Sequence, residues 1–106
     1  MKEIHTDNEF AELYEKSKTP IILDFYTETC NPCKSLMFIL DKLAFEFGNK
    51  IQFLKTRADK NVILARQLGI TSVPTLIFVS QNKEIERANG LITENALRVK
   101  LNELIQ

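Results

Sequence analysis

Two cysteines, Cys30 and Cys33, are the residues of this sequence best suited to chemistry, and they are its only cysteines among 106 residues. They are separated by two residues in the stretch TETCNPCK, between an apolar run and a segment with helical periodicity. Three arrangements use such a pair: a metal site, a redox dithiol, and two buried thiols that act as small apolar side chains.

A metal site within one chain is not expected. A structural zinc site needs about four Cys or His ligands, and His5 is the only histidine. An iron–sulfur cluster bridging two chains stays formally possible, since each chain could supply two thiolates. A Cys-x-x-Cys pair among alternating strands and helices is instead typical of a redox dithiol.

The position of the pair also favours redox chemistry. Cys30 comes after the strand-like run IILDFY and begins a helical pattern. At such a helix start, unpaired backbone N–H groups and the positive end of the helix dipole stabilise a thiolate. Pro32 fits an early helical position, where its missing N–H costs nothing. Cys33 lies about one turn further on, within reach of a mixed disulfide formed at Cys30.

The rest of the chain alternates strand and helix patterns, with glycine and proline where elements end. Strands are expected at residues 2–5, 21–26, 51–56, 75–80 and 83–88, the last two joined by a turn at QNK. Helices are expected after a cap at Thr6–Asp7, from the cysteine pair to Phe47, over residues 61–68, and from Thr93. The order βαβαβαββα predicts an α/β sandwich with a mixed sheet, formed by residues 1–106 as a single domain.

Composition excludes several functional classes. Lysine plus arginine equals aspartate plus glutamate, fourteen each, so a nucleic acid or anionic membrane partner is not expected. No apolar stretch approaches the roughly 20 residues of a membrane span. A single short-range cysteine pair is unlike the several bridges of small secreted domains, and the first ten residues lack the apolar core of a signal peptide. The expected compartment is the cytoplasm.

The segment ILDFYTETCNPCK resembles the active-site segment of thioredoxins, whose usual form is Val-Asp-Phe-Trp-Ala-x-Trp-Cys-Gly-Pro-Cys-Lys. SVPT, residues 72–75, corresponds to the family's Ile-Pro-Thr segment. Asp59 follows a strand bearing Lys55, as in the family, and Gly90 matches the glycine beside the thioredoxin groove. The resemblance runs end to end and implies a thioredoxin fold, with a central mixed β-sheet flanked by helices.

The resemblance implies reduction of protein disulfides, with Cys30 as nucleophile and Cys33 as the resolving thiol. Asp24 interrupts a buried strand, where desolvation raises the pKa of a carboxyl group, and it is the expected proton acceptor for Cys33. The alternative is an aspartate that faces solvent at a strand end. Lys55 is expected to modulate the pKa of Asp24, with an ordinary surface lysine as the alternative.

A second group of residues is implied to bind the substrate. An X–Pro bond is expected to be trans, but the resemblance implies a cis bond between Val73 and Pro74, opposite the dithiol. The Val73 backbone is then able to pair with an extended client chain. Gly90 either lets a client backbone approach closely or is a plain turn glycine. The implied substrate-binding residues are Asn31, Pro32, Val73, Pro74 and Gly90.

Three positions depart from the family pattern. Asn31 replaces the usual glycine and puts no positive charge beside Cys30, which favours a reducing rather than an oxidising dithiol. Tyr26 and Thr29 replace two tryptophans, so the chain has no Trp. Because indoles offer large contact surfaces to partner proteins, the set of clients is expected to differ from that of a general reductase.

The resemblance also implies partners and a cellular role. We expect disulfide-containing client proteins and recycling by an NADPH-dependent thioredoxin reductase, as part of electron transport and cell redox homeostasis. The chain has no glycine-rich nucleotide-binding loop, so it is expected to need no cofactor and no metal, and to act as a monomer. The alternative functions are a disulfide oxidase or isomerase and a non-enzymatic docking subunit with the same fold.

Overall fold

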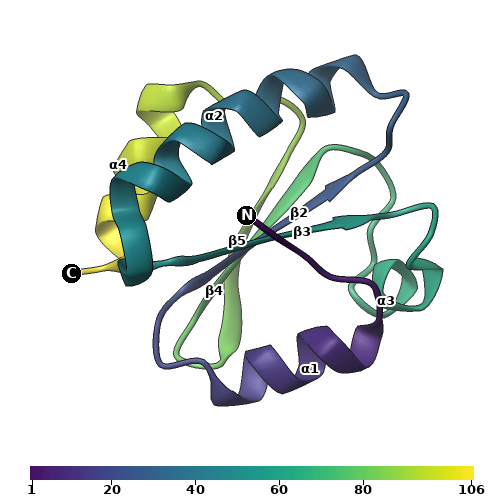
Figure 1. The fold of residues 1–106 in the computed structure, drawn as a ribbon, viewed down its shortest axis with the longest axis horizontal. Coiled ribbons are helices and arrows are strands. Elements are labelled where there is room, and N and C mark those ends of the chain that lie inside the picture. The colour runs from purple at the N-terminus through teal and green to yellow at the C-terminus, as the bar shows by residue number, and fades with distance from the viewer.

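The computed structural model describes all residues, 1–106, and contains a five-stranded sheet with helices on both faces (Figure 1). The predicted order βαβαβαββα is confirmed, with one short 3-10 helix added. The elements are β1 (Lys2–Glu3), α1 (Asp7–Lys16), β2 (Ile21–Tyr26), α2 (Asn31–Phe47), the 3-10 helix (Gly48–Lys50), β3 (Gln52–Arg57), α3 (Val62–Gln67), β4 (Thr75–Ser80), β5 (Lys83–Asn89) and α4 (Glu94–Leu104).

The sheet is mixed, as predicted, and its strand order is β1-β3-β2-β4-β5. β1 and β2 run parallel to β3, whereas β4 is antiparallel to both β2 and β5. β2 is therefore the central strand, and residues 21–25 are fully buried. This burial explains the nearly continuous apolar sequence of β2, which is typical of strands covered on both faces.

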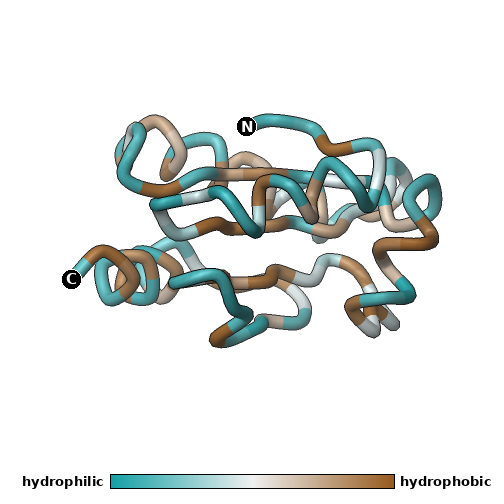
Figure 2. Tube along the Cα trace, turned by 90° about the horizontal axis from the view of Figure 1, so that it is seen from below, coloured by the Kyte–Doolittle hydropathy of each residue, from teal (hydrophilic) through white to brown (hydrophobic).

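Two apolar layers enclose the sheet. One layer joins Ile22 and Phe53 to the inward faces of α2 and α4, and the other joins Leu23 and Leu54 to α1 and α3. Figure 1 shows α2 and α4 on one side of the sheet, with α1 and α3 on the other. In Figure 2 hydrophobic and hydrophilic residues alternate along the helices, as expected for helices with one buried face.

The ends of the elements follow from local side-chain chemistry. The Thr6 hydroxyl accepts a hydrogen bond from the Glu9 N–H at 3.1 Å, and the Thr93 hydroxyl accepts one from the Ala96 N–H at 3.2 Å. These contacts fix the starts of α1 and α4. Gly48 ends α2 with φ of +58°, a conformation that favours glycine.

Several predicted boundaries differ slightly from the structure. β1 covers only Lys2–Glu3 instead of residues 2–5, β3 is shifted by one residue to Gln52–Arg57, and β5 extends one residue further, to Asn89. The β4–β5 turn consists of Gln81 and Asn82 alone, both with positive φ, and Lys83 already belongs to β5. A two-residue turn of this kind matches the twist of the flanking strands. The predicted helix over residues 61–68 is shorter by one residue at each end, because Asn61 and Leu68 are its caps.

Candidate active site

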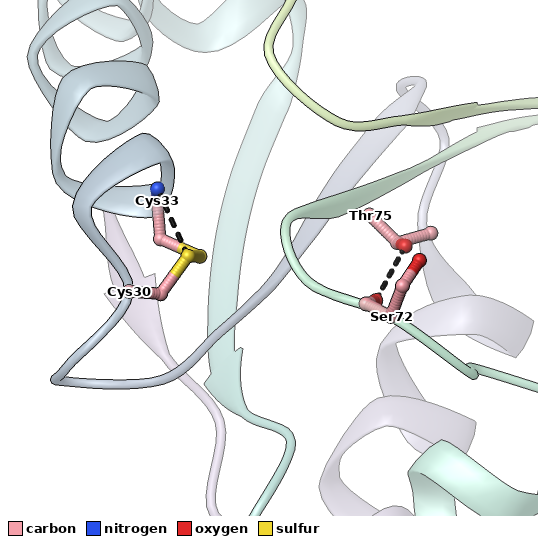
Figure 3. The surroundings of a disulfide bond; sticks show 4 residues. All are labelled: Cys30, Cys33, Ser72 and Thr75. Carbon is pink, nitrogen blue, oxygen red and sulfur yellow. Dashed lines mark hydrogen bonds between the residues drawn. A yellow bond between two sulfur atoms is a disulfide. The ribbon is translucent and has the colours of Figure 1, made fainter.

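Cys30 and Cys33 form a disulfide at the N-terminal end of α2 (Figure 3). Their Cα atoms are 5.2 Å apart. Cys30 is half-buried, whereas Cys33 is only 1% exposed and packs under the first turn of the helix. Cys30 therefore carries the sulfur that another molecule can approach, and Cys33 carries one that is shielded from it.

The helix start is arranged to favour negative charge on Cys30. Cys30 is the N-cap of α2, and its sulfur accepts a hydrogen bond from the Cys33 backbone N–H at 3.2 Å. Pro32 occupies the first turn, as predicted, and that turn contains no acidic residue. The free N–H groups and the helix dipole therefore act on the Cys30 sulfur without competition from a nearby carboxylate on the helix.

Asp24 is buried in the middle of β2, so the alternative of a solvent-facing aspartate is wrong. Its side chain is 0% exposed, and neither carboxylate oxygen has a hydrogen-bond partner. Because side chains alternate along a strand, Asp24 points to the same face as Ile22, the face covered by α2. Burial raises the pKa of Asp24 from 3.8 to about 7, and the positive charge of Lys55 partly offsets this rise.

Lys55 lies directly beside Asp24 in the sheet. The two residues are register partners on the parallel strands β2 and β3, and Lys55 faces the same side as Phe53, toward α2. The half-buried Lys55 forms no salt bridge with Asp24, and its ammonium lies 6.0 Å from the centre of the Tyr26 ring. Lys55 therefore acts on Asp24 through its charge and not through a hydrogen bond.

The segment before β4 belongs to the surroundings of the disulfide (Figure 3). The Val73–Pro74 peptide bond is cis, as the resemblance implied. The Thr75 hydroxyl donates to the Ser72 carbonyl at 2.8 Å, and the Gly90 N–H donates to the Pro74 carbonyl at 2.8 Å. Gly90 has φ of +85° and open space where a Cβ would lie. It is therefore a required turn glycine that also leaves its surface free.

The first residues of α2 complete the candidate site. Asn31 and Pro32 are both exposed, and both lie between the two cysteines. Pro74 is buried, and Val73 is half-buried. The implied substrate-binding residues therefore come from three separate segments: the start of α2, the approach to β4, and the end of β5.

Arg57 was not singled out from the sequence, yet it connects two loops beside the dithiol. Its guanidinium donates to Glu28 at 2.9 Å and to both carboxylate oxygens of Asp59, at 2.7 and 3.2 Å. Glu28 precedes Cys30 by two residues, and Asp59 follows β3. No local sequence pattern could reveal the contact with Glu28, because 29 residues separate it from Arg57.

Tyr26 takes the place of a family tryptophan and is held by a contact of its own. Its hydroxyl donates to the Glu3 carboxylate at 2.8 Å, which joins β2 to the edge strand β1. Burial is the main cause that raises the pKa of Tyr26 above its ordinary value, and the Glu3 carboxylate adds to the rise.

Comparison with known proteins decides the family. The sequence profile of the thioredoxin family matches residues 1–103. The chain belongs to the thioredoxin family. It is 32% identical to thioredoxin of Haemophilus influenzae over 99 residues, covering 93% of this chain and 92% of that one. It is 35% identical to chloroplastic thioredoxin Y of Oryza sativa subsp. japonica, covering 87% of this chain and 55% of that one.

The solved structures agree. The Fasciola hepatica thioredoxin matches with a TM-score of 0.89 and 27% identity, covering 98% of this chain and 99% of that one. The thioredoxin fold and the cysteine pair at its place in that fold make this chain a thiol–disulfide oxidoreductase that acts on disulfide-containing client proteins.

Two further features of the structure bear on metals and membranes. No three or more His, Cys, Asp or Glu side chains are grouped so as to hold a metal ion. None of the helices combines the length and the apolar character that crossing a bilayer requires.

Proposed function

We propose that the Cys30 thiolate attacks one sulfur of a client disulfide, forming a mixed disulfide and releasing the other client sulfur as a thiolate. Cys33 then loses its proton to Asp24, through water, and attacks the Cys30 sulfur. The second client sulfur leaves as a thiolate, and both client thiolates take up protons. Two electrons pass from the dithiol to the client, which ends with two thiols while Cys30 and Cys33 end as a disulfide.

The difference in exposure between the two sulfurs supports these roles. Cys30 is half-buried at the helix start, whereas Cys33 is 1% exposed, so a client disulfide meets Cys30 first. A buried thiol needs a nearby base to ionise, and Asp24 faces the helix that carries Cys33. With a pKa of about 7, Asp24 can take up and release a proton near neutral pH. Lys55 keeps that pKa from rising further.

We assign client binding to Asn31, Pro32, Val73, Pro74 and Gly90. An extended client segment pairs its backbone with Val73, in the manner of an added strand. Asn31 and Pro32 contact the residues around the client disulfide, since both are exposed between the cysteines. The open surface at Gly90 leaves room for the client backbone.

We further propose that residues 1–106 work as one monomeric domain in the cytoplasm, without a cofactor. An NADPH-dependent thioredoxin reductase returns the disulfide to the dithiol, so the chain carries electrons in cell redox homeostasis. The Haemophilus influenzae relative, named thioredoxin and matched over 92% of its length, supports a thioredoxin role for this chain. The rice relative is named chloroplastic, so measuring where the protein resides is a direct test of the compartment.

Equilibration with a glutathione buffer tests the direction of the reaction. The oxidised fraction of the Cys30–Cys33 pair is measured by mass spectrometry after alkylation of free thiols. A reductase has a lower reduction potential than the glutathione couple. The Cys30–Cys33 pair is therefore expected to be mostly oxidised in a glutathione buffer with the poise of a reducing compartment. A pair that stays reduced in an oxidising glutathione buffer would instead identify an oxidase or isomerase.

Two single variants test the roles of the cysteines. Cys33→Ser is expected to accumulate mixed disulfides with client proteins, because the resolving thiol is gone. Cys30→Ser is the matched control and is expected to form none. Equal accumulation by both variants would contradict the division of roles, and client binding that survives loss of both cysteines would indicate a docking subunit.

A further inference from the structure

A surface hollow of about 460 Å³ lies between the loop that leads to Cys30 and the segment that precedes Pro74. Its wall includes Thr27, from the loop that leads to Cys30, and it continues to Val73, directly before Pro74. The remaining wall comes from the β3–α3 loop, the outer part of α3 and residues 70–72. Because Val73 lines the hollow, a client segment that pairs with Val73 borders it.

Half of the ten residues that line the hollow are apolar. These five are Ala58, Val62, Ala65, Ile70 and Val73. Val62, at the start of α3, is the most exposed of them, with 53% of its surface accessible. Covering exposed apolar surface in a concave site with an apolar side chain removes that surface from water, which favours binding.

The hollow is lined by one acidic residue, Asp59, and one basic residue, Arg66. Only Asp59 has an ion-pair partner. Asp59 is paired with Arg57, which donates two hydrogen bonds to it and one to Glu28. Arg66, exposed on α3, makes no salt bridge and no side-chain hydrogen bond. Arg66 is therefore the charged lining residue without a partner, and a carboxylate is its natural counterpart.

We propose that this hollow is a client subsite that takes an apolar side chain flanked by an aspartate or glutamate, with Arg66 as the specificity-determining residue. The inference rests on the proposed function, since the client disulfide must lie at Cys30 for its neighbouring residues to reach the hollow. Clients with acidic and apolar residues near the disulfide are preferred over clients with basic residues there. Arg57 contributes by keeping Asp59 from repelling the client carboxylate.

Single-turnover reduction of peptide disulfides tests the subsite. Three peptides, each dimerised through one cysteine, carry Leu–Glu, Leu–Lys or Ala–Glu on both sides of that cysteine. Pre-reduced protein freed of dithiothreitol is mixed with each peptide, quenched with acid, and analysed by mass spectrometry after thiol alkylation. Natural protein is expected to reduce the Leu–Glu peptide about threefold faster than Leu–Lys, the size of effect that one exposed ion pair gives. It is expected to reduce Leu–Glu about tenfold faster than Ala–Glu.

Charge-reversal variants separate a local effect from a general one. Arg66→Glu is expected to invert the preference between the Leu–Glu and Leu–Lys peptides. Lys18→Glu makes the same change in net charge in the exposed loop between α1 and β2, outside the hollow, and is expected to keep the natural preference. High ionic strength is expected to remove the preference for Leu–Glu over Leu–Lys but to leave the preference for Leu–Glu over Ala–Glu.

The outcomes also distinguish the subsite from the reaction itself. The subsite would be overturned, with the reductase function intact, if the natural protein reduced the Leu–Glu and Leu–Lys peptides at equal rates. It would also be overturned if the ratio of these two rates were the same in Arg66→Glu and Lys18→Glu. If Arg66→Glu does not fold, Arg66→Gln takes its place and is expected to abolish the charge preference. Failure to reduce any peptide, or the small neutral 2-hydroxyethyl disulfide, would instead overturn the proposed function.

Discussion

Replacing Asp24 by asparagine is expected to stabilise the oxidised protein at alkaline pH. Asparagine has nearly the same shape as aspartate, but it carries no charge. In the natural protein both carboxylate oxygens of Asp24 are buried without hydrogen-bond partners, and burial raises its pKa from 3.8 to about 7. Ionised Asp24 therefore opposes folding, because the unfolded chain solvates the charge better than the folded protein does.

The size of the effect follows from the two pKa values. The difference between 3.8 and about 7, at about 1.36 kcal/mol per pKa unit, corresponds to roughly 4 kcal/mol. Below about pH 4 the carboxyl is protonated in both states, so the variant and the natural protein are expected to be equally stable. Between about pH 4 and pH 7 the folded state binds more protons than the unfolded state, so the natural protein loses stability as the pH rises. Above pH 7 the full difference is expected.

Urea unfolding from pH 4 to pH 9 measures this difference. Far-UV circular dichroism is the appropriate probe, because the chain has no tryptophan. Asp41→Asn makes the same substitution at an exposed position of α2, and it is expected to show no comparable pH dependence. If the free energy of unfolding changed with pH in the same way for Asp24→Asn and the natural protein, the claim that a buried, unpaired carboxylate destabilises this fold would be refuted.

Three other predictions test the fold around the site. Thr93→Ala removes the N-cap of α4 and is expected to lower the free energy of unfolding by about 1 kcal/mol. Thr93→Ser keeps the capping hydroxyl and is expected to keep the stability of the natural protein. Urea unfolding measures both variants. Leu40→Ala empties a fully buried position of α2 and is expected to cost about 2–5 kcal/mol in the same assay. In Tyr14→Phe, Tyr26 is the only tyrosine, and its absorbance at 295 nm is expected to rise only well above pH 10, because burial and Glu3 raise its pKa. Normal titration near pH 10 would contradict the contact with Glu3.

Much of the fold was predictable because its signals are local. β2 was predicted with its observed bounds, since a six-residue run that is apolar or aromatic except at Asp24 follows Pro20. α2 was predicted to end before Gly48, which has the positive φ expected of a glycine that ends a helix. The cis bond before Pro74 was implied by the family resemblance alone, because an isolated X–Pro pair is usually trans.

The electrostatic details of the site depend on contacts between distant segments. The sequence indicated that Asp24 was buried, but its lack of hydrogen-bond partners is set by the packing of α2 over the sheet. The contact of Arg57 with Glu28 and that of Tyr26 with Glu3 each join different elements. Such side-chain partners become visible only when the strand order is known.

The central claim is that the start of α2 stabilises the Cys30 thiolate, and the rate of alkylation across pH tests it most directly. The Cys33→Ser variant leaves Cys30 as the only thiol, and its reaction with iodoacetamide is followed by mass spectrometry from pH 5 to pH 10. The pH midpoint of alkylation is expected to lie below about 8.5, the value of an ordinary free cysteine. A midpoint at or above that value would contradict the account.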